Sequence, residues 1–235
     1  MVSLHTFATS CVGCLPNFSV LRDFFGYASA PPWTLAPALE QTNLPQFLSV
    51  ATQIQRLKQT HYSLDLIRVG TIGTTLPAVD EQNLDCAVQM TRDIFGAIGV
   101  GIGRVDRSWF IPLSDNTGYD VIEDSGEGED LVDEYGAPGD GIDVFFVPLF
   151  QGTVSGTTPS KGDGVVVESL ETMFLATART LAHELGHYFG LGHENDTPTN
   201  LMCQGKNANP MPGGTQLNSD QIDEIKDADE MRSPC

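Results

Sequence analysis

The chain has 235 residues, of which 40% are hydrophobic, and it carries a formal net charge of −19. This length and composition fit one folded domain with an additional segment and exclude a largely disordered chain. No run approaches the roughly 18 apolar residues of a membrane-spanning helix. A surface this acidic repels nucleic acid and anionic membranes, so we expect a soluble monomer that meets neutral or cationic partners.

The N-terminal region differs from the rest of the chain. Residues 1–20 lack a basic start followed by an apolar core, so they do not form a convincing signal peptide. We nevertheless expect a secreted, extracellular protein whose signal has been removed. Residues 1–42 are predicted to be an extension or a prosegment, in which Cys11 and Cys14 form a local disulfide or remain thiols. The five cysteines are an odd number, so at least one is free or pairs with another chain.

Hydrophobic periodicity predicts the next elements in chain order. Apolar residues recur at helical spacing in 44–59 and 80–97, whereas 63–72 and 99–111 have the pattern of strands. The run 142–150 is apolar almost throughout, which is typical of a strand buried on both faces.

Residues 116–141 hold a dense group of carboxylates. Calcium prefers several hard oxygen ligands, so a calcium site is one interpretation of this segment. The spacing of an EF-hand is absent, and the other interpretation is an acidic surface loop with a short helix.

The C-terminal third is predicted to contain two helices. Asn218, with Gln221 three residues later, resembles a capping box that opens the last helix. The predicted elements here are a short strand at 165–168, a helix at about 171–190, a loop at 200–214 and a helix from 218 to about 231.

Three of the five histidines lie in one short run. His183 and His187 are four residues apart and share one helix face, with Cβ atoms about 5–6 Å apart. That separation lets both imidazoles bind one Zn²⁺ at about 2.0–2.1 Å. Glu184 would lie beside the metal, where it can hold a water molecule and take its proton. Gly190 can end the helix in the left-handed conformation, so that His193 turns back toward the metal.

Met202 follows the histidines and could form an apolar floor beneath their rings. The pattern HExxHxxGxxH followed by a methionine resembles the metzincin clan of zinc metallopeptidases. The alternative is a buried amphipathic helix with hydrogen-bonded core histidines, which does not explain Glu184 between two of them. Three neutral imidazoles leave a fourth position open for water, as a catalytic zinc site requires.

The resemblance implies an α+β, metzincin-like (zincin) catalytic domain over residues 43–235. It would have a twisted mixed sheet with an antiparallel edge strand and two long helices above the cleft. The upper part would extend to about residue 190, and 191–235 would form an irregular lower subdomain with a C-terminal helix. The edge strand, which pairs with substrate in that clan, maps best to Val165, Val166 and Val167.

Two positions depart from the patterns of known subfamilies. Glu194, after the third histidine, is similar to astacin-like enzymes. Gln204, however, stands where astacin-type and serralysin-type enzymes have a tyrosine, so a fifth, tyrosine ligand is not expected and no subfamily is assigned. Cys203 could form a disulfide with Cys235 and hold the last helix, or it could remain a thiol.

The function that the resemblance implies is that of a zinc-dependent endopeptidase acting on proteins or peptides. One catalytic Zn²⁺ would be held by His183, His187 and His193. Glu184 would act as the general base and then as the general acid. Met202 would support the ligands without taking part in the chemistry.

Two other interpretations stay open. The protein could be a zinc-loaded module that grips extended peptides without cutting them, although such a module has no need of Glu184. It could also be a latent enzyme in which the thiolate of Cys11 or Cys14 caps the zinc until residues 1–42 are removed.

Overall fold

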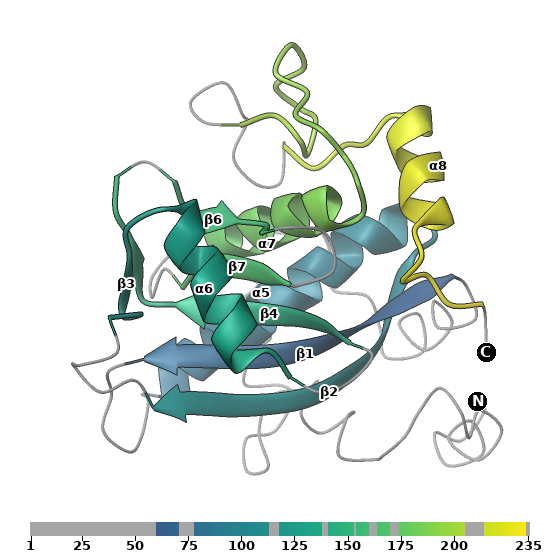
Figure 1. The fold of residues 1–235 in the computed structure, drawn as a ribbon. Helices are drawn as coiled ribbons and strands as arrows, with labels where there is room; N and C mark the ends of the chain where they lie inside the picture. Colours follow the sequence, from purple (N-terminus) through teal and green to yellow (C-terminus); the bar gives the residue numbers. More distant parts are fainter. Residues whose placement is uncertain are drawn as a thin grey trace, which may run out of the picture.

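The computed structural model (Figure 1) describes residues 60–70, 78–112, 118–137, 141–152, 154–159, 164–169, 174–204 and 214–233. Within these ranges the chain forms a mixed α/β fold with one five-stranded sheet, one two-stranded sheet and four helices. The predicted N-terminal extension with its two cysteines, the predicted helix at 44–59 and Cys235 lie outside them.

The main sheet has the strand order β2-β1-β4-β7-β6. β6 (Gly156–Thr157) runs antiparallel to β7 at one edge, so the sheet is mixed, as predicted. β3 (Val121–Ile122) and β5 (Leu149–Phe150) form the separate two-stranded sheet. The other four strands of the main sheet are parallel, and these are β1 (His61–Gly70), β2 (Gly101–Pro112), β4 (Ile142–Val147) and β7 (Val165–Glu168).

The edge strand is not the segment that the sequence indicated. Val165, Val166 and Val167 belong to β7, which lies between β4 and β6, and all three side chains are fully buried. A run of three β-branched apolar residues without a polar alternate is typical of a strand covered on both faces, so the edge assignment was wrong. Among the described residues the antiparallel edge strand is β6, which is two residues long and lies in a segment rich in Gly, Ser and Thr.

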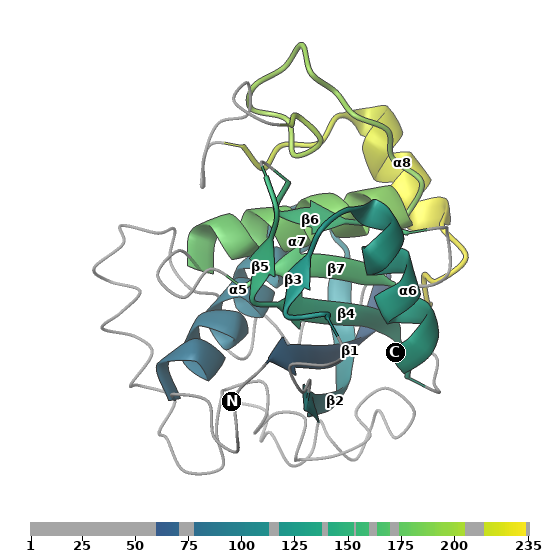
Figure 2. The same ribbon diagram turned by 60° about the vertical axis from the view of Figure 1, so that its left-hand side comes forward.

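Helices cover both faces of the main sheet (Figure 2). α5 (Ala78–Ala97) and α7 (Phe174–Tyr188) pack against each other on one face, and these are the two long helices that the sequence predicted. α6 (Ser125–Tyr135) packs on the opposite face. The site is carried by α7, whose position is set by the sheet beneath it and by α5 beside it.

Alternate residues of β4 supply the two cores. Val144 and Phe146 belong to the core beneath α5 and α7, whereas Phe145 and Val147 belong to the core beneath α6. Successive side chains of a strand point to opposite faces, so an almost wholly apolar strand is buried on both. This confirms the prediction for residues 142–147. Residues 149–150, which were predicted to continue this strand, instead form β5 in the two-stranded sheet, where Leu149 is 46% exposed.

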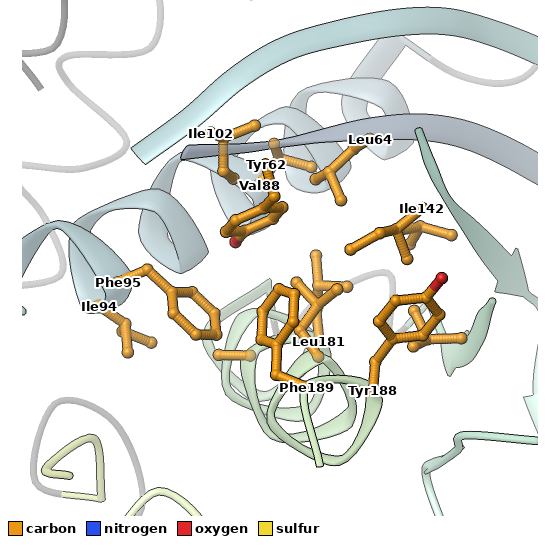
Figure 3. Packing of buried hydrophobic residues seen from close by; sticks show 14 of the residues in the cluster. Tyr62, Leu64, Val88, Ile94, Phe95, Ile102, Ile142, Leu181, Tyr188 and Phe189 are labelled. Atoms are coloured by element: carbon orange, nitrogen blue, oxygen red, sulfur yellow. The ribbon is translucent and has the colours of Figure 1, made fainter. Parts of the chain in front are cut away.

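An aromatic cluster joins α7 to the rest of the fold (Figure 3). Phe189 follows the last residue of α7, and its ring packs edge-on against Tyr62 of β1 and Phe95 of α5, with centroids 5.0 and 5.8 Å apart. Tyr62 and Phe95 also contact each other edge-on at 5.6 Å. Such pairs contribute about 0.5–1.5 kcal/mol beyond the area that they bury. The end of α7 is thereby fixed to both a strand and the neighbouring helix.

The acidic segment contains a short helix, α6, as its second interpretation predicted. Asp124 caps its N-terminus, because its Oδ1 accepts hydrogen bonds from the backbone N–H groups of Gly126 (2.8 Å) and Glu127 (3.1 Å). A carboxylate at this position also interacts favourably with the helix dipole. At least one acidic side chain of the segment therefore has a structural role.

Between α7 and the last helix, α8 (Ser219–Asp227), the described residues 189–204 and 214–218 form no helix or named strand. The predicted capping box is present: Asn218 accepts from the backbone of Gln221 at 3.0 Å, and the Gln221 side chain accepts from the backbone of Asn218 at 3.0 Å. None of the helices in the described ranges is long and apolar enough to cross a membrane.

Replacing Phe95 by alanine tests the aromatic cluster. The ring is fully buried, so Phe95→Ala should lower the free energy of unfolding by about 3–5 kcal/mol, measured by urea denaturation. Leu149→Ala is the control, because that side chain is 46% exposed and its loss should cost far less. Equal losses of unfolding free energy in the two variants would contradict the assignment of Phe95 to the core.

Candidate metal centre

The three histidines of the motif converge at one point. His183 and His187 share one face of α7, and their ring centroids are 4.7 Å apart. The Nε2 atom of His187 lies 3.1 Å from Nε2 of His183 and 3.0 Å from Nε2 of His193. Within the described residues this is the one group of three or more His, Cys, Asp or Glu side chains that could hold a metal ion.

Backbone carbonyls fix the orientation of two of the rings. Nδ1 of His183 lies 2.8 Å from the oxygen of Leu201, and Nδ1 of His187 lies 2.7 Å from the oxygen of Leu191. A carbonyl can only accept, so each Nδ1 carries the hydrogen and each neutral ring directs the Nε2 lone pair at the common point. Burial keeps both rings neutral: it lowers the pKa of His183 to about 4 and also lowers the pKa of His187.

This donor set fits zinc. Two Nε2 atoms without hydrogens cannot hydrogen-bond to each other, so their close approach calls for a cation between them. Tetrahedral zinc with Zn–N bonds of about 2.0–2.1 Å would separate neighbouring nitrogens by about 3.3 Å, close to the observed spacing. Imidazole nitrogen is a ligand that zinc favours. His183, His187 and His193 would be the ligands.

The end of α7 supplies the carbonyl that orients His187. Gly190 has a φ of 103°, a left-handed conformation that glycine adopts without strain. The N–H of Leu191 donates to the oxygen of Gly186 and the N–H of Gly190 to the oxygen of His187, both at 2.9 Å. This pair of bonds is the Schellman motif, which ends the helix at the position indicated by the sequence. It also turns the chain toward His193.

Met202 lies directly beneath α7 and is fully buried. A Cβ atom added to Gly186 would lie only 2.5 Å from the Met202 sulfur and 3.2 Å from its methyl carbon. The methionine can therefore occupy this position only because the residue before His187 has no side chain. The sequence analysis identified Met202 but missed Gly186, although a glycine inside a helix is itself a signal of close approach.

Arg179 is a second residue that the sequence analysis missed. It lies one turn before His183, and its guanidinium donates to the carbonyls of Leu201 (3.1 Å), Cys203 (2.5 Å) and Gly214 (3.1 Å). Charge-assisted bonds of this kind are stronger than neutral ones. Arg179 thus holds the backbone on both sides of Met202 against α7. Its position four residues before His183, on the same helix face, was the available signal.

Of the two states that the sequence left open for Cys203, the structure shows the thiol. Cys203 is a buried free cysteine, and its Sγ lies 3.9 Å from the oxygen of Asn195. The last helix is instead held by an amide pair: the side chain of Asn200 donates to Gln221 at 2.8 Å and accepts from it at 3.3 Å. Gln221 therefore serves both the capping box and the segment that carries Met202.

Glu184 is buried beside the histidines and is held by Thr158. The Thr158 hydroxyl oxygen lies 2.7 Å from Glu184 Oε2 and 2.9 Å from the Glu184 backbone oxygen. Burial raises the pKa of Glu184 to about 7, and the hydrogen bond from Thr158 opposes this shift. Thr158 lies just after β6 in a segment without periodicity, and no sequence signal marked it.

The metal centre does not include Tyr188 or the described carboxylates of the acidic segment. Tyr188 is buried in the core (Figure 3) and packs against Phe189, so it does not reach the histidines. In the described part of the acidic segment, no three carboxylates come together as a metal site. The structure therefore gives no support for calcium.

No protein-family model matches the sequence, and no curated protein matches it. Among solved structures, the chain is similar to metalloproteinase-II from Bacteroides fragilis, with a TM-score of 0.48 and 15% identity over 71% of this chain and 53% of that one. It is similar to archaemetzincin from Methanopyrus kandleri, with a TM-score of 0.41 and 17% identity over 70% and 86%. It is also similar to a zinc-dependent peptidase from Methanocorpusculum labreanum, with a TM-score of 0.39 and 16% identity over 68% and 92%. The chain spans about half the length of the first of these proteins, and no chemistry is transferred from any of them.

The contact between Gly186 and Met202 gives a direct test of the floor of the site. Gly186→Ala should lower the free energy of unfolding by about 1–3 kcal/mol, because the new methyl group has to displace the sulfur. Adding Met202→Ala should recover part of this loss, since the obstructing atoms are then gone.

The matched control is Gly192→Ala. A Cβ atom at Gly192 would meet nothing within 4 Å, so the free energy of unfolding of this variant should lie within about 0.5 kcal/mol of the wild-type value. Additive losses for Gly186→Ala and Met202→Ala in a double-mutant cycle would show that the two residues do not contend for the same space.

Proposed function

We propose that the protein is a zinc-dependent endopeptidase of the metzincin type. The observation that carries the proposal is the convergence of three imidazoles next to a buried carboxylate, with Nε2 of His187 3.1 Å from that of His183 and 3.0 Å from that of His193. Zinc bound there would supply Lewis acidity, which polarises a peptide carbonyl and acidifies a water molecule. Three protein ligands leave a position for substrate or water, as hydrolysis requires.

Glu184 is the residue that would move protons. A base that later acts as an acid works best when its pKa lies near the working pH, and burial raises the pKa of Glu184 to about 7. It would accept a proton as water attacks the peptide carbonyl. It would then give that proton to the departing amine. A purely structural histidine cluster has no need of a buried carboxyl group beside it, which argues against a module that binds peptides without cutting them.

The edge strand would receive an extended peptide. Among the described residues β6 ends the sheet, because it pairs with β7 on one side and with no strand on the other. Backbone groups on the outer side of an edge strand can pair with a peptide strand. A Cβ atom on Gly156 would lie 2.9 Å from Glu184 Cγ, so this strand passes directly beside the proposed base. Residues 156–157 thus replace Val165–Val167 as the proposed substrate edge.

Secretion and latency stay predictions. The cysteines of residues 1–42 lie outside the described residues, so a thiolate that caps the zinc is neither supported nor opposed by the site. N-terminal sequencing of active material would show whether the segment is removed.

Replacing the base tests the catalytic mechanism. Glu184→Gln keeps the size of the side chain but cannot accept the proton, so turnover should fall by about 10²- to 10⁴-fold at unchanged zinc content. Cleavage of an unfolded protein is read by mass spectrometry, which also maps the bonds that are cut. Glu123→Gln, at an exposed position before α6, is the control and should cleave at the wild-type rate. A zinc-loaded Glu184→Gln variant as active as the wild type would refute the role.

Metal removal tests the ligand set. The wild type should bind one zinc ion per chain, and a chelator should abolish cleavage and lower the melting temperature until zinc is restored. With free zinc at about 100 times its Kd, the stabilisation is about 2.7 kcal/mol. His193→Ala should lose most of the zinc affinity with little change in apoprotein stability, because this ring is exposed. Undiminished zinc affinity in that variant would remove His193 from the site.

A further inference from the structure

We propose that Thr158 is a positioning residue for Glu184: its hydroxyl holds one carboxylate oxygen and leaves the other to accept the proton. The inference rests on the proposed peptidase function. It goes beyond that function by assigning a role to a residue outside the histidine motif.

The contacts define which oxygen is held. Thr158 Oγ1 lies 2.7 Å from Glu184 Oε2 and 2.9 Å from the Glu184 backbone oxygen. A hydroxyl has one hydrogen to donate, and both of these oxygens are acceptors when Glu184 is ionised. The charged oxygen is the stronger acceptor, so the hydroxyl donates to Oε2. Oε1 is then the carboxylate oxygen without this partner.

The strand explains why Thr158 reaches Glu184. Alternate residues of a strand point to the same side, and here both neighbours of Thr157 face α7. A Cβ atom on Gly156 would lie 3.0 Å from Glu184 Oε1 and 2.7 Å from Thr180 Cγ2. Thr157 points the other way, since its methyl group would meet a Cβ atom on Gly128 of α6 at 2.7 Å. The segment therefore leaves space for the Glu184 side chain at Gly156 and places the Thr158 hydroxyl within hydrogen-bonding distance of it.

This arrangement suits a group that changes charge during the reaction. When water attacks the peptide carbonyl, one of its O–H bonds breaks and a new O–H bond forms on Oε1, while Thr158 keeps its own proton. Glu184 is then neutral, and Oε2 becomes an acceptor no better than a backbone carbonyl. The Thr158 hydroxyl can turn to the Glu184 backbone oxygen at 2.9 Å, so it has a partner in both states. The carboxyl group is held in place without being fixed in its charged form.

The alternative is that Thr158 only joins the segment after β6 to α7. A link of that kind would affect stability and substrate binding, but it would not affect the proton transfer in particular. Two measurements separate these roles. A positioning role predicts a loss of kcat in a variant without the hydroxyl, and it predicts that serine, which keeps the hydroxyl, preserves kcat.

The experiment compares full-length, zinc-loaded wild type, Thr158→Val and Thr158→Ser. Valine replaces the hydroxyl by a methyl group of similar size, and serine keeps the hydroxyl. Loss of a hydrogen bond to a charged group predicts that Thr158→Val lowers kcat about 10- to 100-fold, with KM within about twofold and zinc content unchanged. Thr158→Ser should stay within about threefold of the wild-type kcat.

Thr91→Val is the matched control. The Thr91 hydroxyl also contacts the backbone of α7, at the oxygen of Ala178 (3.1 Å), but it lies away from Glu184. This variant should lose stability and keep the wild-type kcat. If Thr158→Val also lost stability but kept the wild-type kcat, Thr158 would be only a structural link and the proposal would be overturned.

A crystal structure of zinc-loaded Thr158→Val gives a measurement that does not depend on turnover. The Glu184 carboxylate should leave its wild-type position or occupy more than one rotamer. A carboxylate in the wild-type position would overturn the proposal even if the wild type proved inactive. An inactive, zinc-loaded wild type would overturn the peptidase function alone, so the two failures are distinguishable.

Discussion

The Leu201 carbonyl is the point on which the site depends. It accepts hydrogen bonds from Nδ1 of His183 and from the guanidinium of Arg179, two residues of α7 one turn apart. One backbone oxygen in the segment beneath the helix therefore fixes a ligand ring and is itself held by the helix that carries the ring. The Leu191 carbonyl orients the ring of His187 in the same way. The motif places imidazoles on one helix face, but the course of the chain after the helix decides where their lone pairs point.

The surrounding core makes this arrangement rigid and also sets its electrostatics. His183 and Glu184 are 7% and 6% exposed, so both lie where charge is poorly solvated. Burial acts on them in opposite directions, because it favours the neutral form of each: the pKa of His183 falls to about 4 and that of Glu184 rises to about 7. In the proposed peptidase, the same desolvation would prepare the ring to bind a metal and the carboxyl group to exchange a proton near neutral pH. Both effects require α7 to stay on the sheet, which the cluster around Phe189 ensures.

What could be predicted from the sequence follows from the range of the interactions involved. The helices and long strands are visible because apolar residues repeat with the period of each element. The capping box of Asn218 and the helix end at Gly190 are visible because they depend on neighbours within a few residues. Thr158 and Arg179 were missed because their partners lie in segments distant in the sequence. The edge strand was misplaced for a related reason: a two-residue strand has no period, whereas the three valines of β7 looked like a strand but gave no sign of which strands flank them.

The position of β6 would link substrate binding to the proposed base, Glu184. A two-residue edge strand paired on one side only has few bonds of its own to hold it. Gly156 and Thr158 compensate for this, because the first lets the backbone approach Glu184 closely and the second donates to its carboxylate. A peptide paired with the outer side of β6 would be aligned by the same short segment that holds the proton acceptor. The distance between the bond to be cut and Glu184 would then be set by one strand and one helix in direct contact.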